Sequence, residues 1–339
     1  MSKVLVTGAS GFVGYHLIRR LLDRGDDVTC LVRSSSNTEL LDQLDVRKAR
    51  GDVTDRDSLA RAIPGHDVVY HVAGCIRSFA YRTMFEINGA GPGNVARICA
   101  QQETPPRLVA VSSLAAAGPA SRQHPKTEND PSHPISIYGR SKLLGEKMMR
   151  RYADRLAISI VRPGIVFGEA DRSGLELFKP IARTRIHFSP GFRRKRYSVI
   201  HGTDLADLLI LTCEHGTPIT TSPRTPELAG RGIYFAACDE APTFQEFGRM
   251  IGHALGCRYI VPLSFGPPMV YTVATIMELG GYMTGRPALL NRDKAHEGLS
   301  GPWWCANEKA KKELGFQIDV SLFERLKQTA DWYREHKWL

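Results

Sequence analysis

The stretch "TGASGFVG" at residues 7–14 decides the fold that we expect for this chain. It separates an apolar run at 4–7 from a helical pattern at 12–22. Its first glycine permits a tight turn, the second lets backbone N–H groups approach a pyrophosphate, and the third lets the helix lie close to the sheet. The helix N-terminus turns its positive end to the phosphates. The alternative is an ordinary glycine-rich connection. We predict a dinucleotide-binding loop that contacts its cofactor through Gly8, Ser10, Gly11, Phe12, Val13 and Gly14.

Strands and helices alternate through the first half of the chain. Apolar runs predict further strands at 28–32, 46–49, 67–72, 108–112 and 158–161. Periodic segments and capping signals predict helices at 55–62, 81–101 and 138–152. This alternation implies β-α-β crossovers, and hence an α/β fold with a doubly wound parallel sheet of the Rossmann type. Ligands of such a sheet bind at the carboxyl ends of its strands.

The pattern loosens after Pro163. We predict helices near 203–214, 243–255, 268–283 and 321–336, in a smaller C-terminal substrate lobe of mixed structure. The predicted domains are an NAD(P)-binding Rossmann domain at 1–165 and a substrate-binding lobe at 166–339, with segments such as 197–215 returning to the first domain. The segment 116–137 contains four prolines and no clear periodicity, which is typical of a functional or mobile loop.

Composition narrows the class of protein. The seven cysteines are widely spaced and without a C-x-x-C pair, which argues against a disulfide framework or a metal site and favours a reducing, cytoplasmic compartment. We expect no secretory leader, because a strand-like run begins at Val4. The net charge of +10 permits an acidic partner, but no zinc-finger or RNA-binding signature accompanies it, so we expect no nucleic acid. No apolar run reaches the roughly 18 residues of a membrane span, and we interpret 267–283 as a buried or interfacial helix.

Residues after the second, third and fourth strands indicate the cofactor. An NAD site usually places a carboxylate after the second strand, but here Arg33 follows, and a guanidinium can pair with a 2′-phosphate. This favours NADP(H), with NAD(H) as the alternative. Asp52 and Val53 are predicted to contact the adenine, although Asp52 is equally suited to forming a turn. Ala73 and Gly74 are small enough to lie against a ribose, and His71 is interpreted as a core histidine.

A serine, a tyrosine and a lysine form the candidate catalytic set. The fifth predicted strand ends in Ser112 and Ser113, and the following helix carries Tyr138 and Lys142 in "YGRSK". Residues four apart lie on one face of a helix. A free phenol with a pKa of about 10 transfers protons poorly at neutral pH. A neighbouring ammonium and a positively charged nicotinamide would lower that pKa. Hydride transfer at a carbinol needs such a proton shuttle, a charge that tunes it and a hydroxyl that aligns the oxygen.

These motifs together resemble the extended short-chain dehydrogenase/reductase family, that is, the NAD-dependent epimerase/dehydratase-like proteins. The match is ordered along most of the chain: TGASGFVG (7–14), GDVTD (51–55), HVAG (71–74), Asn88 in EINGAG, SS before LAAAG (112–118), YGRSK (138–142), RPGIVFG (162–168) and IHGTDLADLL (200–209). Gly89 departs from the branched residue that is common in the family.

The resemblance implies roles for individual residues. Ser113 matches the catalytic serine better than Ser112, Tyr138 matches the acid/base, and Lys142 would bind the nicotinamide ribose. Asn88 would position the backbone near the site. A last group would lie against the nicotinamide: Pro163, Ile165 and Val166. The resemblance also implies a homodimer that packs through helices of the dinucleotide domain.

Two C-terminal stretches, GRPALLNRDK (285–294) and WWCANEKAKKELGF (303–316), are most similar to the 3β-hydroxysteroid dehydrogenase-like branch. The leading hypothesis is therefore an NADP(H)-dependent oxidoreductase for the hydroxyl or ketone of a bulky, sterol-like or lipid-like substrate. The apolar segment 267–283 and the basic run 193–196 suit a substrate taken from a membrane surface, so we expect at most peripheral membrane contact.

Two other functions stay open at this point. The first is an NDP-sugar 4-epimerase or dehydratase with bound NAD, although Arg196 lies about one residue away from the register that a nucleotide-sugar arginine would need. The second is a non-catalytic nucleotide sensor or scaffold, against which the complete set of Ser113, Tyr138 and Lys142 argues.

Overall fold

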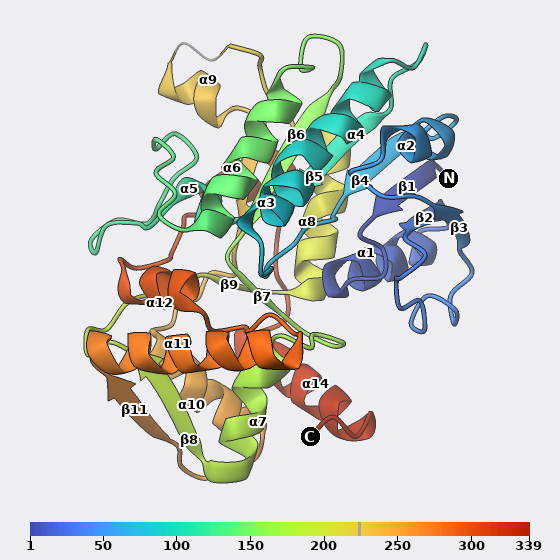
Figure 1. Ribbon diagram of the computed structural model, residues 1–339. Helices are drawn as coiled ribbons and strands as arrows, with labels where there is room; N and C mark the ends of the chain where they lie inside the picture. Colours follow the sequence, from blue (N-terminus) through green and yellow to red (C-terminus); the bar gives the residue numbers. More distant parts are fainter. Residues whose placement is uncertain (223–224) are drawn as a thin grey trace.

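A parallel seven-stranded sheet forms the centre of the computed structural model, which describes residues 1–222 and 225–339 (Figure 1). Its strand order is β10-β6-β5-β4-β1-β2-β3. The sheet therefore grows outward from β1 in both directions, and the crevice at the carboxyl ends of β1 and β4 is its topological switch point. The strands are β1 (Lys3–Thr7), β2 (Asp27–Val32), β3 (Arg47–Arg50), β4 (Val68–His71), β5 (Arg107–Val111), β6 (Ile158–Pro163) and β10 (Ile233–Ala236).

Helices cover both faces of this sheet, as the apolar runs of its strands require. One layer consists of α1 (Phe12–Asp23), α8 (Gly202–His215) and α13 (Glu308–Leu314). The other consists of α2 (Arg56–Ala62), α4 (Gly91–Ala100) and α6 (Ile137–Arg150). Successive residues of a strand point to opposite faces. In β1, Val4 and Val6 accordingly join the core beneath the first layer, whereas Leu5 joins the core beneath the second.

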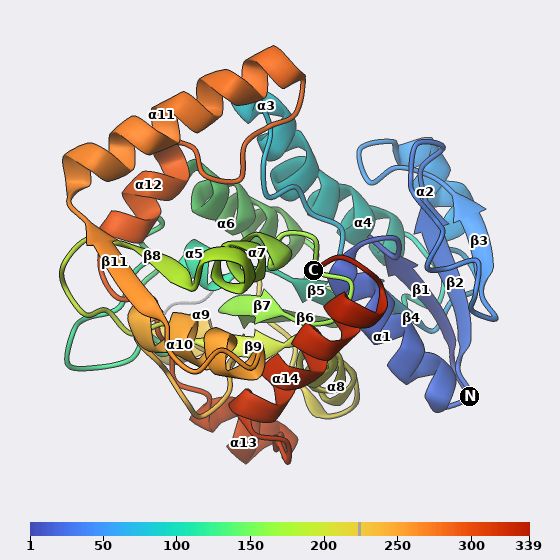
Figure 2. The ribbon, with the colours of Figure 1, turned by 90° about the horizontal axis from the view of Figure 1, so that it is seen from below.

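The C-terminal lobe lies across the carboxyl ends of the strands (Figures 1 and 2). Its own core is aromatic, with Phe178, Phe247 and Tyr333 buried together. The lobe contains two short pairs of parallel strands, β7 with β9 and β8 with β11. Its elements are β7 (Ile165–Phe167), α7 (Leu175–Thr184), β8 (Ile186–Pro190), β9 (Val199–His201), α10 (Phe244–Ala254), β11 (Val261–Phe265), α11 (Pro267–Thr284), α12 (Arg292–Leu299) and α14 (Leu322–Glu335). Two short helices, α5 (Leu114–Ala117) and α9 (Pro226–Gly230), stand outside these groups.

The structure confirms the doubly wound α/β fold and the predicted strands of the first half. The helices predicted near 203–214, 243–255, 268–283 and 321–336 correspond to α8, α10, α11 and α14. The helix predicted at 81–101 is continuous but not uniform. It consists of α3 (Tyr81–Phe85), a π-helical turn η1 (Glu86–Ala90) and α4.

The C-terminal half supplies more of the central layers than the prediction named. Besides α8, it contributes strand β10 at the edge of the sheet and helix α13 against β10. The predicted domain boundary at residue 165 stays a prediction. Three separate segments of the second half, α8, β10 and α13, pack in the layers of the first domain.

A buried ion pair fastens α6 to β6. The guanidinium of Arg162 donates to both carboxylate oxygens of Glu146, from Nε at 2.9 Å and from Nη2 at 2.6 Å. Both side chains are less than 5% exposed. The hydroxyl of Ser112 donates to the same carboxylate, and Arg162 also donates to Ser132 at 3.1 Å. Because every partner of this group is polar and in contact, the charges are compensated although they are buried.

We predict that Glu146→Gln destabilises the fold by about 3 kcal/mol or more, because the variant leaves the Arg162 charge buried without its counterion. The matched control is Glu86→Gln, which breaks the exposed Arg82–Glu86 pair and should cost less than about 1 kcal/mol. Urea denaturation followed by circular dichroism measures both. A Glu146→Gln loss as small as that of the control would contradict this interpretation.

Candidate active site

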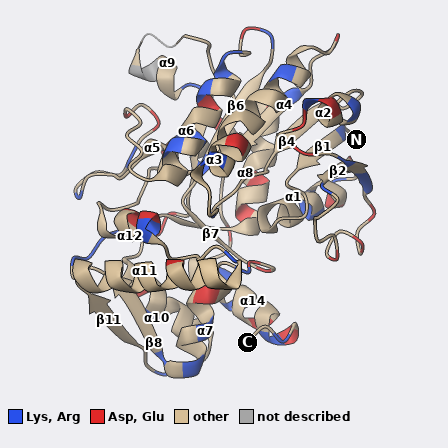
Figure 3. Ribbon diagram, in the orientation of Figure 1, with Lys and Arg blue, Asp and Glu red and all other residues tan. Residues whose placement is uncertain are grey.

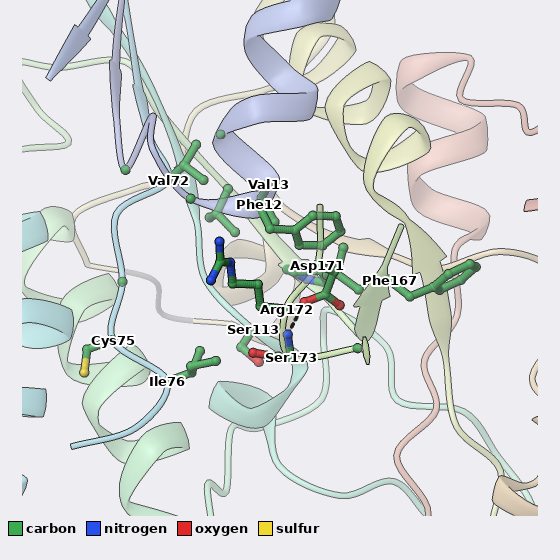
Figure 4. Close-up of a pocket in the computed structure, with 18 of the residues that line it drawn as sticks. Phe12, Val13, Val72, Cys75, Ile76, Ser113, Phe167, Asp171, Arg172 and Ser173 are labelled. Atoms are coloured by element: carbon green, nitrogen blue, oxygen red, sulfur yellow. Dashed lines mark hydrogen bonds between the residues drawn. The ribbon is translucent and has the colours of Figure 1, made fainter. Parts of the chain in front are cut away.

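A continuous cleft of about 1210 Å³ runs along the carboxyl ends of the strands and on into the C-terminal lobe. In Figure 4, Phe12 and Val13 of the glycine loop, Val72 after β4, Ser113 after β5 and Arg172 after β7 surround the same cavity. Four segments far apart in the sequence thus meet at the switch point of the sheet.

The glycine loop forms its wall at β1. Gly8 has φ of +71°, and a Cβ there would lie 2.5 Å from the backbone nitrogen of Ala73. A Cβ on Gly14 would lie 2.4 Å from the carbonyl oxygen of Gly8. The turn and the close approach of helix and sheet therefore both require glycine. At Gly11, by contrast, the only close contact of a Cβ would be the Gly8 oxygen at 3.2 Å, so this position opens toward the cleft.

The start of α1 is suited to an anion. Gly11 is the N-cap residue and has no side chain to accept from the first-turn N–H groups, and the first turn holds no acidic residue. Phe12, Val13 and Gly14 line the cleft at this point. Free N–H groups at the positive end of a helix are what a pyrophosphate needs. The residues present therefore fit the phosphates of a dinucleotide.

The adenosine end of the cleft contains Arg33, whose exposed side chain borders the cavity. Its backbone N–H donates to Ser36 at 3.1 Å, so the loop after β2 turns back on itself. This turn brings Ser36 and Asn37 to the cleft wall instead of the neighbouring Ser34 and Ser35. It also brings Glu39 there, a carboxylate that the sequence analysis did not consider.

Asp52 and Val53 border the cleft after β3. Asp52 Oδ1 accepts from the backbone N–H of Thr54 at 2.8 Å and from its hydroxyl at 2.7 Å. Asp52 therefore forms the turn that the sequence analysis weighed, and it lines the cavity as well.

Asn88 does not border the cleft but holds one of its walls. Its side chain accepts from the N–H of Cys75 and donates to the carbonyl of Cys75, both at 2.7 Å. It also donates to the Ser141 hydroxyl at 3.0 Å. The π-helical turn η1 presents it, a distortion frequent at functional sites. Asn88 thus connects the segment of Ala73 and Gly74 with helix α6, and its effect on a cofactor would pass through that backbone.

The two serines after β5 have different surroundings. Ser112 is buried and its hydroxyl is committed to Glu146. Ser113 is the N-cap of α5, accepts from the N–H of Ala115 at 3.1 Å, and lines the cleft together with Tyr138, whose pKa it lowers. Ser113 is therefore the serine whose hydroxyl can reach a ligand beside Tyr138.

Tyr138 and Lys142 lie on the face of α6 that borders the cleft. Withdrawal from water raises the pKa of Tyr138 to about 12, and the hydrogen bond from Ser113 opposes this change. The lowering expected from the sequence belongs to the cofactor-bound site, where a positively charged nicotinamide acts beside Lys142, and it stays a prediction. Burial lowers the pKa of Lys142 to about 8, against the opposing effect of Glu146. The Lys142 ammonium donates to the carbonyl of Val111 at 2.7 Å.

Helix α12 contributes a group of charged residues that the sequence analysis did not assign to the site. Lys294 Nζ lies 4.7 Å from the centre of the Tyr138 ring and donates to Glu297 at 3.0 Å. Asp293 accepts from the backbone N–H groups of Ile137 and Tyr138, at 2.9 and 3.4 Å. A carboxylate at this end of α6 also suits the helix dipole. Tertiary contact alone brings α12 to Tyr138.

Of the predicted site residues, all except Asn88 line the cleft. The prediction missed Arg172, which borders the cavity and whose Cζ lies 5.2 Å from the centre of the Trp338 ring. It also missed the apolar lining of the lobe, which includes Leu177, Phe178, Tyr197, Phe244, Phe247 and Trp303.

The sheet, its switch point and the glycine loop place the chain among the doubly wound proteins that bind dinucleotides. The chain belongs to the NAD dependent epimerase/dehydratase family, whose model matches residues 4–221. It is accordingly an NAD(P)-dependent oxidoreductase, as the sequence predicted, and its relatives support the 3β-hydroxysteroid dehydrogenase-like branch.

Relatives match along nearly the whole chain. A ceramide reductase of Caulobacter vibrioides is 28% identical over 336 residues, which cover 99% of this chain and 96% of the relative. A 3 beta-hydroxysteroid dehydrogenase/Delta 5→4-isomerase of Mycobacterium tuberculosis is 27% identical, with 97% and 94% covered. Among solved structures, a UDP-glucose 4-epimerase of Thermotoga maritima superposes with a TM-score of 0.77 at 18% identity, covering 99% of both chains. At that identity the last comparison establishes the fold.

The lowered pKa of Lys142 leads to a prediction about stability. Below pH 8 the ammonium is charged in both states, so folding carries the full cost of burying it. Between about pH 8 and its ordinary 10.5, only the unfolded chain holds the proton, and this site's contribution to stability rises with pH. Lys142→Met removes the charge but leaves one carbonyl unpaired. We expect the variant to be about 1–2 kcal/mol more stable at pH 7, with the difference shrinking toward pH 10.

Urea denaturation at several pH values measures this difference. The control is Lys142→Arg, which keeps its charge throughout the range and should therefore lack the rise between pH 8 and 10. A Lys142→Met variant that is less stable than the native chain at every pH, with no change across the window, would contradict the prediction.

Proposed function

We propose that this protein is an NADP(H)-dependent oxidoreductase that transfers a hydride between nicotinamide and the hydroxyl or ketone of a bulky, mostly apolar substrate. The observation that carries the proposal is the meeting of Ser113, Tyr138 and Lys142 on one cleft that begins at the glycine loop and continues into an apolar lobe.

Each of these side chains has a distinct task in the proposal. The Ser113 hydroxyl holds the substrate oxygen beside the Tyr138 phenol. Tyr138 donates the proton to that oxygen in reduction and accepts it in oxidation. Lys142 binds the ribose and favours the phenolate through its charge, against the effect of burial. When bound, the nicotinamide supplies or accepts the hydride, and Pro163, Ile165 and Val166 would lie against it.

The lining of the lobe supports an apolar substrate. Beyond Tyr138, aromatic side chains of Tyr197, Phe244 and Trp303 border the cleft, and a buried apolar cluster surrounds them. Beside Tyr138, the charges of Lys294 and Glu297 neutralise each other, while Asp171 and Arg172 also line the lobe's part of the cleft. The names of the relatives point the same way, since ceramide and 3β-hydroxysteroids are both lipids. We infer that this chain also acts on a sterol-like or lipid-like compound.

The NDP-sugar epimerase or dehydratase is the alternative on the same scaffold. It would require basic groups that pair with a nucleotide diphosphate in the lobe, and Arg172 is the side chain that could contribute there. Release of NAD on denaturing the purified protein, together with binding of a UDP- or dTDP-sugar, would favour this alternative. The homodimer through the dinucleotide-domain helices stays a prediction from the family.

We predict that Tyr138→Phe lowers kcat by at least about a hundredfold, because the phenol is the proton carrier and general acid–base catalysis contributes about 10²–10⁴-fold. The Kd for NADPH should change less than about threefold, since the ring is retained. Turnover of a hydrophobic ketone and fluorescence titration of NADPH measure the two effects. Turnover that survives the substitution would overturn the assignment of Tyr138.

The preference for NADP(H) depends on Arg33. We predict that Arg33→Ala weakens NADPH binding by about tenfold or more and leaves NADH binding nearly unchanged, because a guanidinium pairs with the 2′-phosphate that only NADPH carries. Asp52→Asn is the control, since a carboxylate near the adenine should affect both cofactors alike. Equal losses for NADPH and NADH in Arg33→Ala would exclude Arg33 as the reader of the 2′-phosphate.

A further inference from the structure

Helix α11 is apolar on the outside. Of its 18 residues, only Val270, Ala274 and Gly281 are buried, and Glu278 is its single charged residue. Eight large apolar side chains are at least one-third exposed: Met269, Tyr271, Val273, Ile276, Met277, Leu279, Tyr282 and Met283. Isolated exposed apolar residues are ordinary, but a contiguous row of this size marks an interaction surface.

This surface continues toward the mouth of the cleft. The rings of Tyr282 and Phe79 lie 4.9 Å apart, which joins α11 to the segment before α3. Figure 2 shows α11 along one edge of the molecule, with its C-terminal end beside α3. Ile76, three residues before Phe79, is 45% exposed and lines the cleft. Exposed apolar side chains therefore stand both beside the end of α11, at Tyr282 and Phe79, and at the cleft, at Ile76.

Three exposed arginines lie near the two ends of α11. Along the helix, Figure 3 shows almost no charged residue. Glu278 is neutralised by Arg292, with Nε at 3.1 Å from Oε2. Exposed Arg286 follows the C-terminal end. Near the N-terminal end, Phe192 approaches Gly266, and the exposed Arg193 and Arg194 come next. We call the α11 row with these three arginines the α11 face.

The order of apolar and basic groups on the α11 face matches an anionic lipid surface. A helix that lies in the interface buries its apolar side chains below the headgroups and places arginines at the level of the phosphates. A second copy of this chain is less suitable, because the described residues of the α11 face include a single acid, Glu278, which Arg292 already pairs, so a two-fold contact would add three arginines from each copy without an acid for them. None of the helices in the described part of the chain is long and apolar enough to cross a membrane.

We propose that the α11 face docks on anionic lipid membranes and that the apolar substrate passes from the bilayer into the cleft along Tyr282, Phe79 and Ile76. The entry path rests on the proposed function, whereas the docking of α11 does not. The site of docking is close to the site of chemistry, because α12 packs on α11 and its Asp293 contacts the backbone of Tyr138.

The experiment measures co-sedimentation of the full chain with vesicles of phosphatidylcholine, with and without phosphatidylglycerol. The test variant replaces Ile276, Leu279 and Met283 by serine. These residues share one face of α11 and are among its most exposed, so the fold should tolerate the change. The control is Phe323→Ser, which replaces a 43% exposed apolar residue on α14.

We expect the native chain and Phe323→Ser to bind the anionic vesicles and the triple variant to bind at least tenfold more weakly. Replacing Arg193, Arg194 and Arg286 by alanine should also weaken binding at least tenfold and remove most of its salt dependence. The proposal would be overturned if the native chain bound the anionic vesicles no more strongly than the variant with serine at positions 276, 279 and 283. It would also be overturned by a native dimer that the triple variant converts to a monomer, since a second copy would then cover α11.

Turnover of a water-soluble ketone separates the two proposals. The variant with serine at positions 276, 279 and 283 should reduce this ketone at the native rate, because its substitutions lie outside the catalytic set. If vesicle binding fails while this turnover depends on Tyr138, only the docking proposal is lost. If vesicle binding succeeds while Tyr138→Phe keeps its activity, the proposed function is lost and the membrane contact stands.

Discussion

The buried contact between Glu146 and Arg162 is the constraint on which the candidate site depends. Glu146 stands one helical turn after Lys142, and Arg162 lies near the end of β6, so their two hydrogen bonds fix α6 in height and rotation. Ser112 joins the same carboxylate from the end of β5. A slip of one residue along α6 would move Tyr138 by about 1.5 Å and turn it by about 100°. Proton transfer does not tolerate such a displacement.

The same carboxylate also determines the electrostatics of the cleft. Glu146 raises the pKa of Lys142 against the effect of burial, so that the ammonium remains largely charged at neutral pH. One buried anion therefore serves two buried cations, Lys142 and Arg162, and the balance at the end of β6 is positive. Burial nevertheless raises the pKa of Tyr138 to about 12, so these cations do not by themselves yield a phenolate at neutral pH. The cost of that charge explains why we expect a neutral side chain at 142 to stabilise the fold.

Local patterns predicted the parts of the site that local chemistry determines. The conformation of Gly8, the cap at Gly11 and the shared face of Tyr138 and Lys142 each follow from a few neighbouring residues. Strand β10 and helix α12 escaped prediction for the opposite reason. The four residues of β10 are too few to separate a strand from a loop by period, and α12 is a polar helix whose contact with Tyr138 arises only in the folded chain. The effect of burial on the pKa of Tyr138 was likewise not predicted, since burial is not visible in spacing.

Helix α12 contacts two different parts of the molecule, the N-terminus of α6 and helix α11. Its Asp293 holds the N-terminus of α6, and the preceding Arg292 pairs with Glu278 on α11. Ala295 and Leu299 pack with Val270 and Ala274 in a small core of their own. Two adjacent residues, Arg292 and Asp293, thus connect α11 with the N-terminus of α6. The same short helix therefore packs against α11 on one side and holds the start of α6, where Tyr138 lies, on the other.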